Sequence, residues 1–130
     1  MSKVVYITGG TKGIGFGIAE ILLKNGYKVA ISGRNEEGVE QAVNDLKSHS
    51  TEIFGVVSNV ANYEDEVKAV ESIVGHFGEL DVAIANAGLG IFNSVEDMEI
   101  EDWKAMIDTN LSGVFYTLKS SVTQLKQNKG

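Results

Sequence analysis

A glycine-rich segment near the start of the sequence has the residue types and spacing to hold a phosphate group. Its glycines fit a T-G-x-x-x-G-x-G pattern, in the order Thr8, Gly9, Gly10, Thr11, Lys12, Gly13, Ile14, Gly15. Glycine at positions 9 and 13 permits a tight turn and a close approach of the backbone to a diphosphate, while glycine at 15 lets a following helix pack closely. The N-terminus of that helix would face the negative charge. The alternative is a flexible surface loop, which the flanking elements described below disfavour.

Other chemistries have little support in the sequence. No Gly-Lys-Ser/Thr follows the glycines at the spacing of a nucleoside-triphosphatase loop. The chain has no cysteine, and its two histidines, His49 and His76, lack a carboxylate or cysteine neighbour at metal-ligand spacing. We therefore predict no metal site and expect both histidines to be exposed cations near helix C-termini.

The elements that would position the glycine turn alternate along the chain. Apolar runs predict strands over residues 4–8, 29–32, 53–57 and 80–85, and segments of helical period lie between them. Such alternation implies right-handed crossovers and a parallel sheet covered on both faces. The predicted fold is a doubly wound α/β, Rossmann-like sheet, whose strands lie in the order 3-2-1-4 if it follows the dinucleotide-binding arrangement. Its ligand crevice should open at the carboxyl ends of the first and fourth strands.

The expected helices have recognisable starts and apolar stripes. The first should end near Asn25 and Gly26, Asn35 is suited to cap the second, and Asn62 precedes three acids that suit the first turn of the third. Apolar residues spaced by three or four then predict one long amphipathic helix, along Trp103, Ile107, Leu111, Val114, Leu118, Val122 and Leu125. Trp103 is expected in the core.

With its strand and helix in place, the glycine turn resembles the cofactor signature of the short-chain dehydrogenase/reductase family, and the similarity extends over essentially the whole chain. Asn86-Ala87-Gly88, after the fourth strand, matches the N-A-G element that shapes the cofactor site in this family. Asn110 matches the family's asparagine at a local helix distortion, which organises a proton-relay water. Outside that context, the first would be an ordinary turn and the second a satisfied interior amide.

The resemblance also implies which nicotinamide cofactor is bound. NAD enzymes of this fold place an acid after the second strand, but here Gly33 stands at that position and Arg34 follows it. Arg34 can clamp a 2′-phosphate in a bidentate contact, and Lys12 occupies the family's second basic position. The sequence thus favours NADP(H) over NAD(H). Asn59-Val60 replaces the family's usual Asp-Val near the adenine, where an amide oxygen can still accept a hydrogen bond.

The family's catalytic residues are not found in these 130 residues. Its members use a tyrosine as general acid/base, a lysine four residues later and a serine that binds the substrate oxygen. No tyrosine here has a lysine at that spacing, and Tyr116 and Lys119 are only three apart on a helix. We therefore predict a single domain, residues 1–130, that is the N-terminal part of a longer enzyme truncated after about four strands. The segment alone is expected to be inactive, with Asn110 its one catalytic candidate.

Composition limits the partners. The formal net charge of −7 disfavours nucleic acid and anionic membranes, and no segment has the length of a membrane span or the layout of a signal peptide. We expect a cytoplasmic oxidoreductase acting on a small carbonyl or alcohol. It should form homo-oligomers through the long helix and the exposed sheet edge. The alternatives are a non-enzymatic dinucleotide-binding or sensor module, and an assembly protein with a vestigial site.

Overall fold

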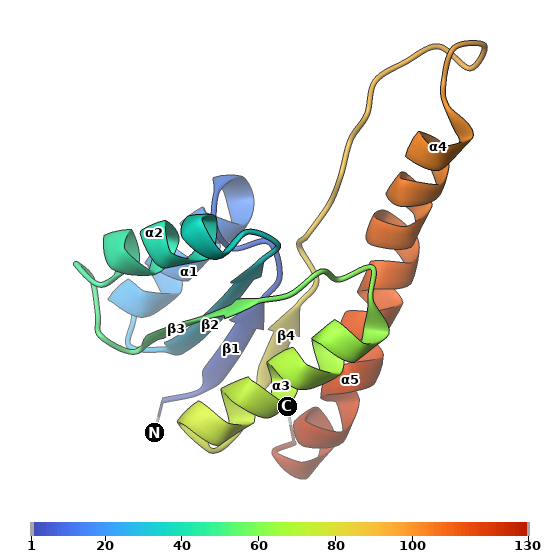
Figure 1. Ribbon diagram of the computed structural model, residues 1–130. Coiled ribbons are helices and arrows are strands. Elements are labelled where there is room, and N and C mark those ends of the chain that lie inside the picture. The colour runs from blue at the N-terminus through green and yellow to red at the C-terminus, as the bar shows by residue number, and fades with distance from the viewer. Residues whose placement is uncertain (1, 130) are drawn as a thin grey trace.

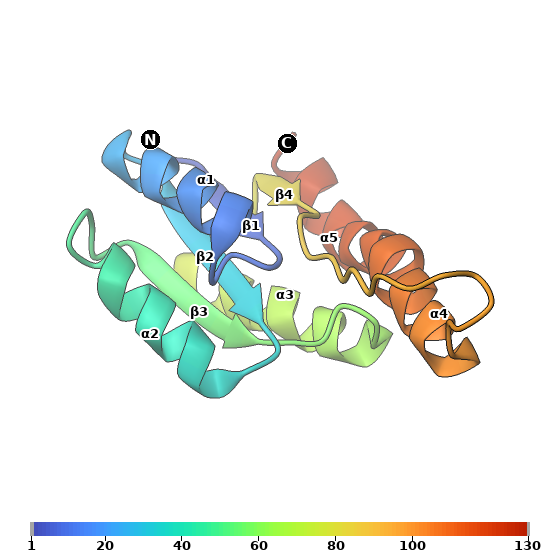
Figure 2. The same ribbon diagram turned by 90° about the horizontal axis from the view of Figure 1, so that it is seen from above.

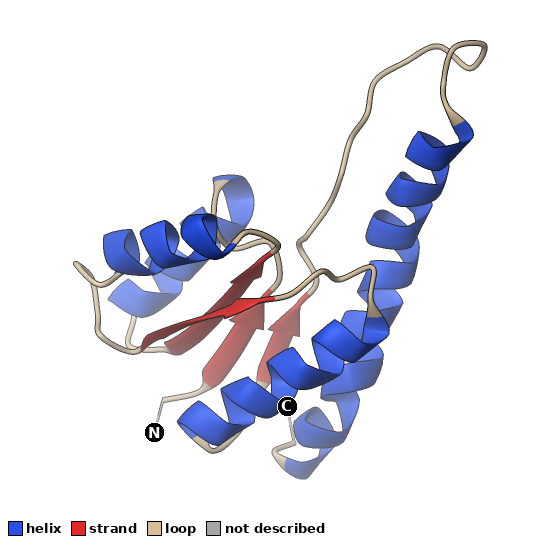
Figure 3. Cartoon of the chain, viewed as in Figure 1, coloured by secondary structure: helices blue, strands red, loops and turns tan. Residues whose placement is uncertain are grey.

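The computed structural model describes residues 2–129 as a four-stranded parallel sheet with helices on both faces (Figure 1). The strands are β1 (Val4–Ile7), β2 (Lys28–Gly33), β3 (Ile53–Val57) and β4 (Val82–Ile84), in the order β3-β2-β1-β4. Figure 3 shows how all four point the same way. Val5 pairs with Val29 on one side and with Val82 on the other. The predicted doubly wound sheet and its strand order are confirmed.

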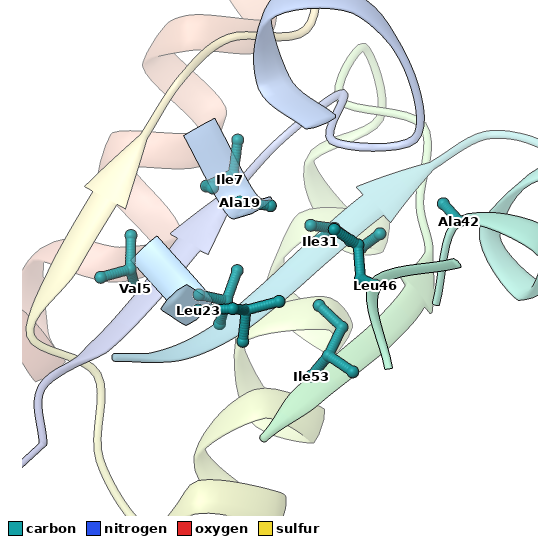
Figure 4. Packing of buried hydrophobic residues seen from close by; sticks show 9 residues of the cluster. Val5, Ile7, Ala19, Leu23, Ile31, Ala42, Leu46 and Ile53 are labelled. Carbon is teal, nitrogen blue, oxygen red and sulfur yellow. The ribbon is translucent and has the colours of Figure 1, made fainter. Parts of the chain in front are cut away.

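One face of the sheet is covered by α1 (Gly13–Lys24) and α2 (Glu36–Leu46). Strand side chains alternate in direction, so Val5 and Ile7 of β1 point to this side. Together with the helices they form a core of apolar residues only, drawn in Figure 4: Val5, Ile7, Ala19, Leu23, Val29, Ile31, Ala42, Leu46 and Ile53. This layer carries the glycine turn at the start of α1.

The opposite face is covered by α3 (Tyr63–Phe77) and α5 (Gly113–Gln127), as the view from above shows (Figure 2). Its core combines the alternate strand residues Val4, Tyr6, Ala30 and Val56 with Ala69, Val70 and Ile73 of α3 and with Leu80, and Leu125 of α5 packs against them. Unlike the first core, this layer also buries polar groups, of which Glu66 in the first turn of α3 is the largest. The sequence pattern indicates only that the acids of that first turn suit the helix dipole, and it does not predict that Glu66 is buried.

The predicted long helix is instead three segments. They are α4 (Ile100–Ile107), a π-helical turn η1 (Asp108–Ser112) and α5, which form one continuous column in Figure 1. The upper part of the column, with the loop that leads into it, projects beyond the sheet. Trp103 lies there with 57% of its surface exposed, so its prediction as a core residue is wrong. The expected stripe is also largely exposed, at Ile107, Leu111, Leu118 and Val122.

Two helices, α2 and α3, begin at the asparagine caps that the sequence predicts. Asn35 Oδ1 accepts a hydrogen bond from the Gly38 N–H at 3.0 Å, and Asn62 Oδ1 accepts one from the Asp65 N–H at 3.1 Å. His49, expected to lack a carboxylate partner, lies with Nε2 3.0 Å from Glu20 Oε2.

Among the residues that the structure describes, no helix has the length and apolar character needed to cross a membrane.

Candidate nucleotide-binding site

A cavity of about 480 Å³ lies at the carboxyl ends of the strands, where the sequence predicted the crevice. Such a volume lies within the range of small-molecule and cofactor sites. Segments at or directly after the carboxyl ends of all four strands meet in it, together with one residue of the later helical column. Its lining comprises Gly9, Thr11, Lys12, Gly13, Ile14, Ser32, Gly33, Arg34, Asn35, Gly38, Ser58, Val60, Asn86, Ala87, Gly88 and Thr109.

Hydrogen bonds tie the glycine turn to the segment after β4. Thr8 Oγ1 accepts from the backbone N–H groups of Asn86 and Ala87, each at 3.0 Å. In return, Asn86 Nδ2 donates to the carbonyl oxygens of Thr8 and Gly9, each at 3.1 Å. The buried Thr8 and the Asn86 amide thus fix the two halves of the cavity floor to each other, although Thr8 itself does not line the cavity.

Position 15 must be glycine because of these same hydrogen bonds between the turn and Asn86. A Cβ atom at position 15 would lie 2.5 Å from Asn86 Nδ2 and 2.5 Å from the Gly9 carbonyl oxygen. The close approach is therefore to the Asn86 side chain and the turn, rather than to a strand side chain. Within residues 2–129, α1 has neither an acidic residue in its first turn nor a side-chain cap. Its N-terminal N–H groups are consequently left for an anion.

Positive charge borders the cavity where β2 ends. Lys12 and Arg34 both line it and are exposed. Among the described residues neither forms an ion pair with a carboxylate, since the ion pairs present join Glu20 to Lys24 and His49. Gly33, which precedes Arg34 and also lines the cavity, contributes no side chain. The combination attracts an anionic group and contains no acid that would repel one.

Asn59 and Asn110, two other residues predicted from the sequence, lie outside the cavity lining. Asn59 Oδ1 accepts from the Ala61 N–H at 3.0 Å. Asn110 is within η1, where its Oδ1 accepts from the Leu89 N–H and its Nδ2 donates to the Leu89 carbonyl, both at 2.8 Å. The helix distortion expected at Asn110 is therefore present. The predicted residues that do not line the cavity are Thr8, Gly10, Gly15, Asn59 and Asn110.

The structure adds five lining residues that the sequence analysis missed, namely Ser32, Asn35, Gly38, Ser58 and Thr109. A signal existed for two of them. Ser32 is at the end of β2 and Ser58 directly follows β3, and the carboxyl ends of parallel strands meet at one edge of a sheet. Thr109 had no signal beyond its place beside Asn110. Asn35 had been assigned as a helix cap alone.

Beneath the cavity, the fully buried carboxylate of Glu66 in α3 is hydrogen-bonded to β1, to α5 and to the segment that follows β3. Its Oε2 accepts from Tyr6 Oη at 2.8 Å and from Ser58 Oγ at 2.6 Å, and its Oε1 accepts from Thr117 Oγ1 at 2.8 Å. Burial, and then the charge of Glu66, raise the pKa of the Tyr6 phenol well above its ordinary value. Tyr6 therefore stays protonated and acts as a hydrogen-bond donor. Because Ser58 also lines the cavity, the network supports its floor.

No tyrosine among residues 2–129 lines the cavity. Tyr6 is committed to Glu66, and Tyr63 packs against Tyr116 with ring centroids 5.6 Å apart. The described residues thus offer a place to bind a nucleotide, without a phenol placed to transfer a proton into it.

Comparison with known proteins agrees with this arrangement. The family model described as short chain dehydrogenase matches residues 3–130. The chain belongs to the short-chain dehydrogenase family. A curated relative of this short-chain dehydrogenase is 3-oxoacyl-[acyl-carrier-protein] reductase FabG of Staphylococcus aureus, which is 38% identical over 133 residues. That alignment covers 100% of this chain and 54% of the relative. The short-chain dehydrogenase chain thus spans about half the length of the curated relatives it matches.

Solved structures match over the same extent. An alcohol dehydrogenase from the archaeon Thermococcus sibiricus, complexed with 5-hydroxy-NADP, superimposes with a TM-score of 0.93 and 35% identity. It is covered over 56% of its length, and this short-chain dehydrogenase chain over 100%. A 3-ketoacyl-(acyl-carrier-protein) reductase from Brucella melitensis, complexed with NADH, gives 0.90 and 29%, with 97% of this chain and 51% of that one covered. The two neighbours were thus solved with different nicotinamide cofactors.

Proposed function

We propose that this chain is the NADP(H)-binding part of an oxidoreductase that interconverts carbonyls and alcohols. The observation that carries the proposal is one cavity, lined by the glycine turn and the N-terminus of α1, by Gly33, which has no side chain, and by the cations Lys12 and Arg34, which form no ion pair within residues 2–129. An acid at that position would favour NAD(H), whereas cations there favour the additional 2′-phosphate of NADP(H). Bound cofactor would supply or accept a hydride.

The proposed contacts follow from the geometry of the cavity. The turn and the first N–H groups of α1 hold the diphosphate, and Arg34 and Lys12 hold the 2′-phosphate. Val60 and the backbone beside Asn59 border the adenine end. Residues 86–88 border the nicotinamide end, held in place by Thr8. The residues proposed to shape the site directly or from behind are Thr8, Gly9, Gly10, Thr11, Lys12, Gly13, Ile14, Gly15, Gly33, Arg34, Asn59, Val60, Asn86, Ala87 and Gly88.

We further propose that residues 1–130 are the N-terminal part of a longer single-domain enzyme. The proposal is supported by the relatives, of which the chain spans about half, and by the lack of a tyrosine at the cavity of residues 2–129. The serine, tyrosine and lysine of the reaction would then come from the remaining part of the protein. Asn110 would contribute through the backbone of Leu89, which its side chain holds. The chain by itself would be inactive.

The proposed enzyme is cytoplasmic and acts on a small-molecule carbonyl or alcohol. We also propose that it associates with copies of itself through the outer face of α4 and α5 and the free edge of β4. The support is the row of exposed apolar side chains along that column, which water solvates poorly, and the pairing of β4 with β1 alone among the described strands. An isologous contact would bury the row of each copy against its partner.

Titration calorimetry of the full-length protein with NADPH and NADH tests the cofactor assignment. We expect NADPH to bind at least about tenfold more tightly, which corresponds to about 1.4 kcal/mol. Arg34→Asp should weaken or reverse the preference, and Lys24→Asp, at the far end of α1, serves as the charge-matched control. Equal affinities for the two nucleotides in the unmutated protein would show the assignment to be wrong.

A second measurement separates the enzyme from a non-catalytic nucleotide-binding module. NADPH oxidation is assayed with ketones and β-ketoacyl thioesters, using the 130-residue chain and the full-length protein. Loss of a general acid costs ~100- to 10,000-fold, so only the full-length protein should show saturable turnover. Turnover by the short chain would mean that another residue, such as Tyr116, supplies the proton. Failure of both to turn over while binding NADPH would favour the sensor module.

A further inference from the structure

The space beside Gly33 is already filled by the glycine turn. A Cβ atom at Gly33 would lie 2.7 Å from the Cγ2 methyl of Thr11 and 3.2 Å from Cγ2 of Val39, but 3.6 Å from Thr11 Oγ1. The nearest clash is thus with one methyl group. The Thr11 hydroxyl would lie at an ordinary contact distance from that Cβ atom. Of the two branches of the Thr11 side chain, only the methyl group therefore excludes a side chain at position 33.

Thr11 has little room to withdraw from this contact. Its neighbour Gly10 donates a hydrogen bond from its N–H to the Ser32 carbonyl at 3.1 Å, which fixes the turn against the end of β2. A Cβ at Gly10 would lie only 2.5 Å from Ile31, so the turn is seated directly on the strand. Threonine is also stiff about χ1 because it is branched at Cβ. On the other side, Val39 is buried in the core between α2 and the sheet.

We infer that Thr11 is a specificity-determining residue: its methyl group occupies the place of a side chain at position 33, so that an acid cannot be accommodated there. This inference rests on the proposed function and deepens it. Cofactor preference is then a joint property of Thr11 and Gly33, rather than of the residue at the end of β2 alone. A carboxylate introduced at position 33 displaces the phosphate-holding turn before it can reach a ribose hydroxyl.

The test separates the methyl group from the hydroxyl and the steric effect from the charge. Thr11→Ser removes only the clashing methyl, while Thr11→Val keeps a methyl and loses the hydroxyl. In the full-length protein, Gly33→Ala should weaken NADPH binding by about tenfold, because its Cβ forces Thr11 from its rotamer. Adding Thr11→Ser should restore most of that loss. Adding Thr11→Val should not.

The acidic variants test selectivity itself. Gly33→Asp alone should lose NADPH affinity by at least about tenfold without gaining NADH affinity. Gly33→Asp combined with Thr11→Ser should bind NADH at least about tenfold more tightly than Gly33→Asp alone. Thermal unfolding of the same variants, without nucleotide, should show the same rescue of Gly33→Ala by Thr11→Ser.

The outcomes distinguish this inference from the proposed function. If the unmutated protein binds neither nucleotide, the proposed function and the specificity role of Thr11 both fail. Only the inference fails if the unmutated protein prefers NADPH and Gly33→Asp gains the same affinity for NADH whether or not it is combined with Thr11→Ser. It fails likewise if Thr11→Val rescues Gly33→Ala as fully as Thr11→Ser does.

Discussion

The two faces of the sheet are stabilised in different ways. The layer of α1 and α2 buries an apolar core alone, whereas the layer of α3 and α5 also buries the Glu66 carboxylate with three hydroxyl donors. On that second side, Ser121 Oγ is the one buried side-chain polar atom of the described residues without a hydrogen-bond partner. The difference shows that complementary shape suffices for the first layer. The second depends on polar groups being matched as well.

The two layers also differ in how completely they are covered. Apolar side chains of the first layer face the sheet, with Ile14 and Ile21 of α1 the exposed large exceptions. In the second layer, α5 turns small polar residues such as Thr117 and Ser121 inward and leaves Phe115, Leu118 and Val122 exposed. Helix α5 thus has a buried inner face with small polar residues and an exposed outer face with large apolar residues. Burial of the outer one requires a partner surface.

The largest expected effect comes from a cavity in the first layer. Leu46→Ala removes a fully buried side chain, and we expect it to lower the free energy of unfolding by about 2–5 kcal/mol. Denaturant titration of the full-length protein measures the change. Leu118→Ala, on the exposed side of α5, is the matched control. A similar loss for both variants would contradict the distinction between the layers.

A smaller effect is expected from the polar network of the second layer. Glu66→Leu leaves the hydroxyls of Tyr6 and Ser58 without their acceptor, while the Thr117 hydroxyl can still donate to the Gly113 carbonyl, and we expect about 2 kcal/mol of destabilisation. Glu66→Gln, which keeps the shape and one acceptor oxygen, should cost less than half of that. Combining Glu66→Leu with Ser58→Ala should cost less than the sum of the single changes, because the orphaned Ser58 hydroxyl is removed. Additive losses would show that the network does not act as a unit.

The pH dependence of the second layer provides a further comparison. Burial first, and the charge of Glu66 second, raise the pKa of Tyr6 above its ordinary value of 10.0, so the folded state keeps this proton to higher pH than the unfolded state. The contribution is complete below about pH 10 and is lost as the pH rises through the raised value. The free energy of unfolding should therefore fall more steeply above about pH 10 in the unmutated protein than in Tyr6→Phe. Parallel curves for the two proteins would contradict this assignment.

The smallest effect on stability is expected at the outer face of α5. Leu118→Asp should change the free energy of unfolding by no more than about 0.5 kcal/mol, since the side chain is not buried in the chain. If the proposed self-association is correct, the same variant should shift the sedimentation coefficient toward the monomer. Lys119→Asp, one residue further along α5, is the charge control. If the unmutated protein already sediments as a monomer, the proposed self-association is wrong.

These contrasts also explain what the sequence could predict. The four strands and the caps at Asn35 and Asn62 follow from local patterns, namely apolar runs and capping side chains, whereas the strand order came from the arrangement of dinucleotide-binding folds. The exposure of Trp103 could not be predicted, because helical periodicity identifies an apolar face without showing what covers it. The burial of Glu66 was missed for a related reason. Its three hydroxyl donors are 60, 8 and 51 residues away in the sequence, so no local pattern brings them together.

In the candidate site, too, some residues could be predicted from the sequence and others could not. The glycine turn and residues 86–88 were recognisable because each is a short contiguous segment, and the structure brings them together around Thr8. Ser58 lines the same cavity without belonging to any motif. The close fit between Thr11 and Gly33 depends on the register of the turn against β2. Spacing along the chain does not specify it.

The π-helical turn η1 has a consequence for the phase of the column that contains it. Such a turn places one extra residue in the helix, and each residue of an α-helix advances the direction of the side chains by about 100°. Deleting one residue between Asp108 and Ser112 would turn Thr117 away from Glu66 and bring a flanking side chain inward. The same rotation would move Asn110 relative to Leu89, or move α5 relative to α3. The extra residue thus sets the rotation of α5 relative to η1. With that rotation, Asn110 in η1 bonds to the backbone of Leu89 while Thr117 in α5 points toward the buried carboxylate of Glu66.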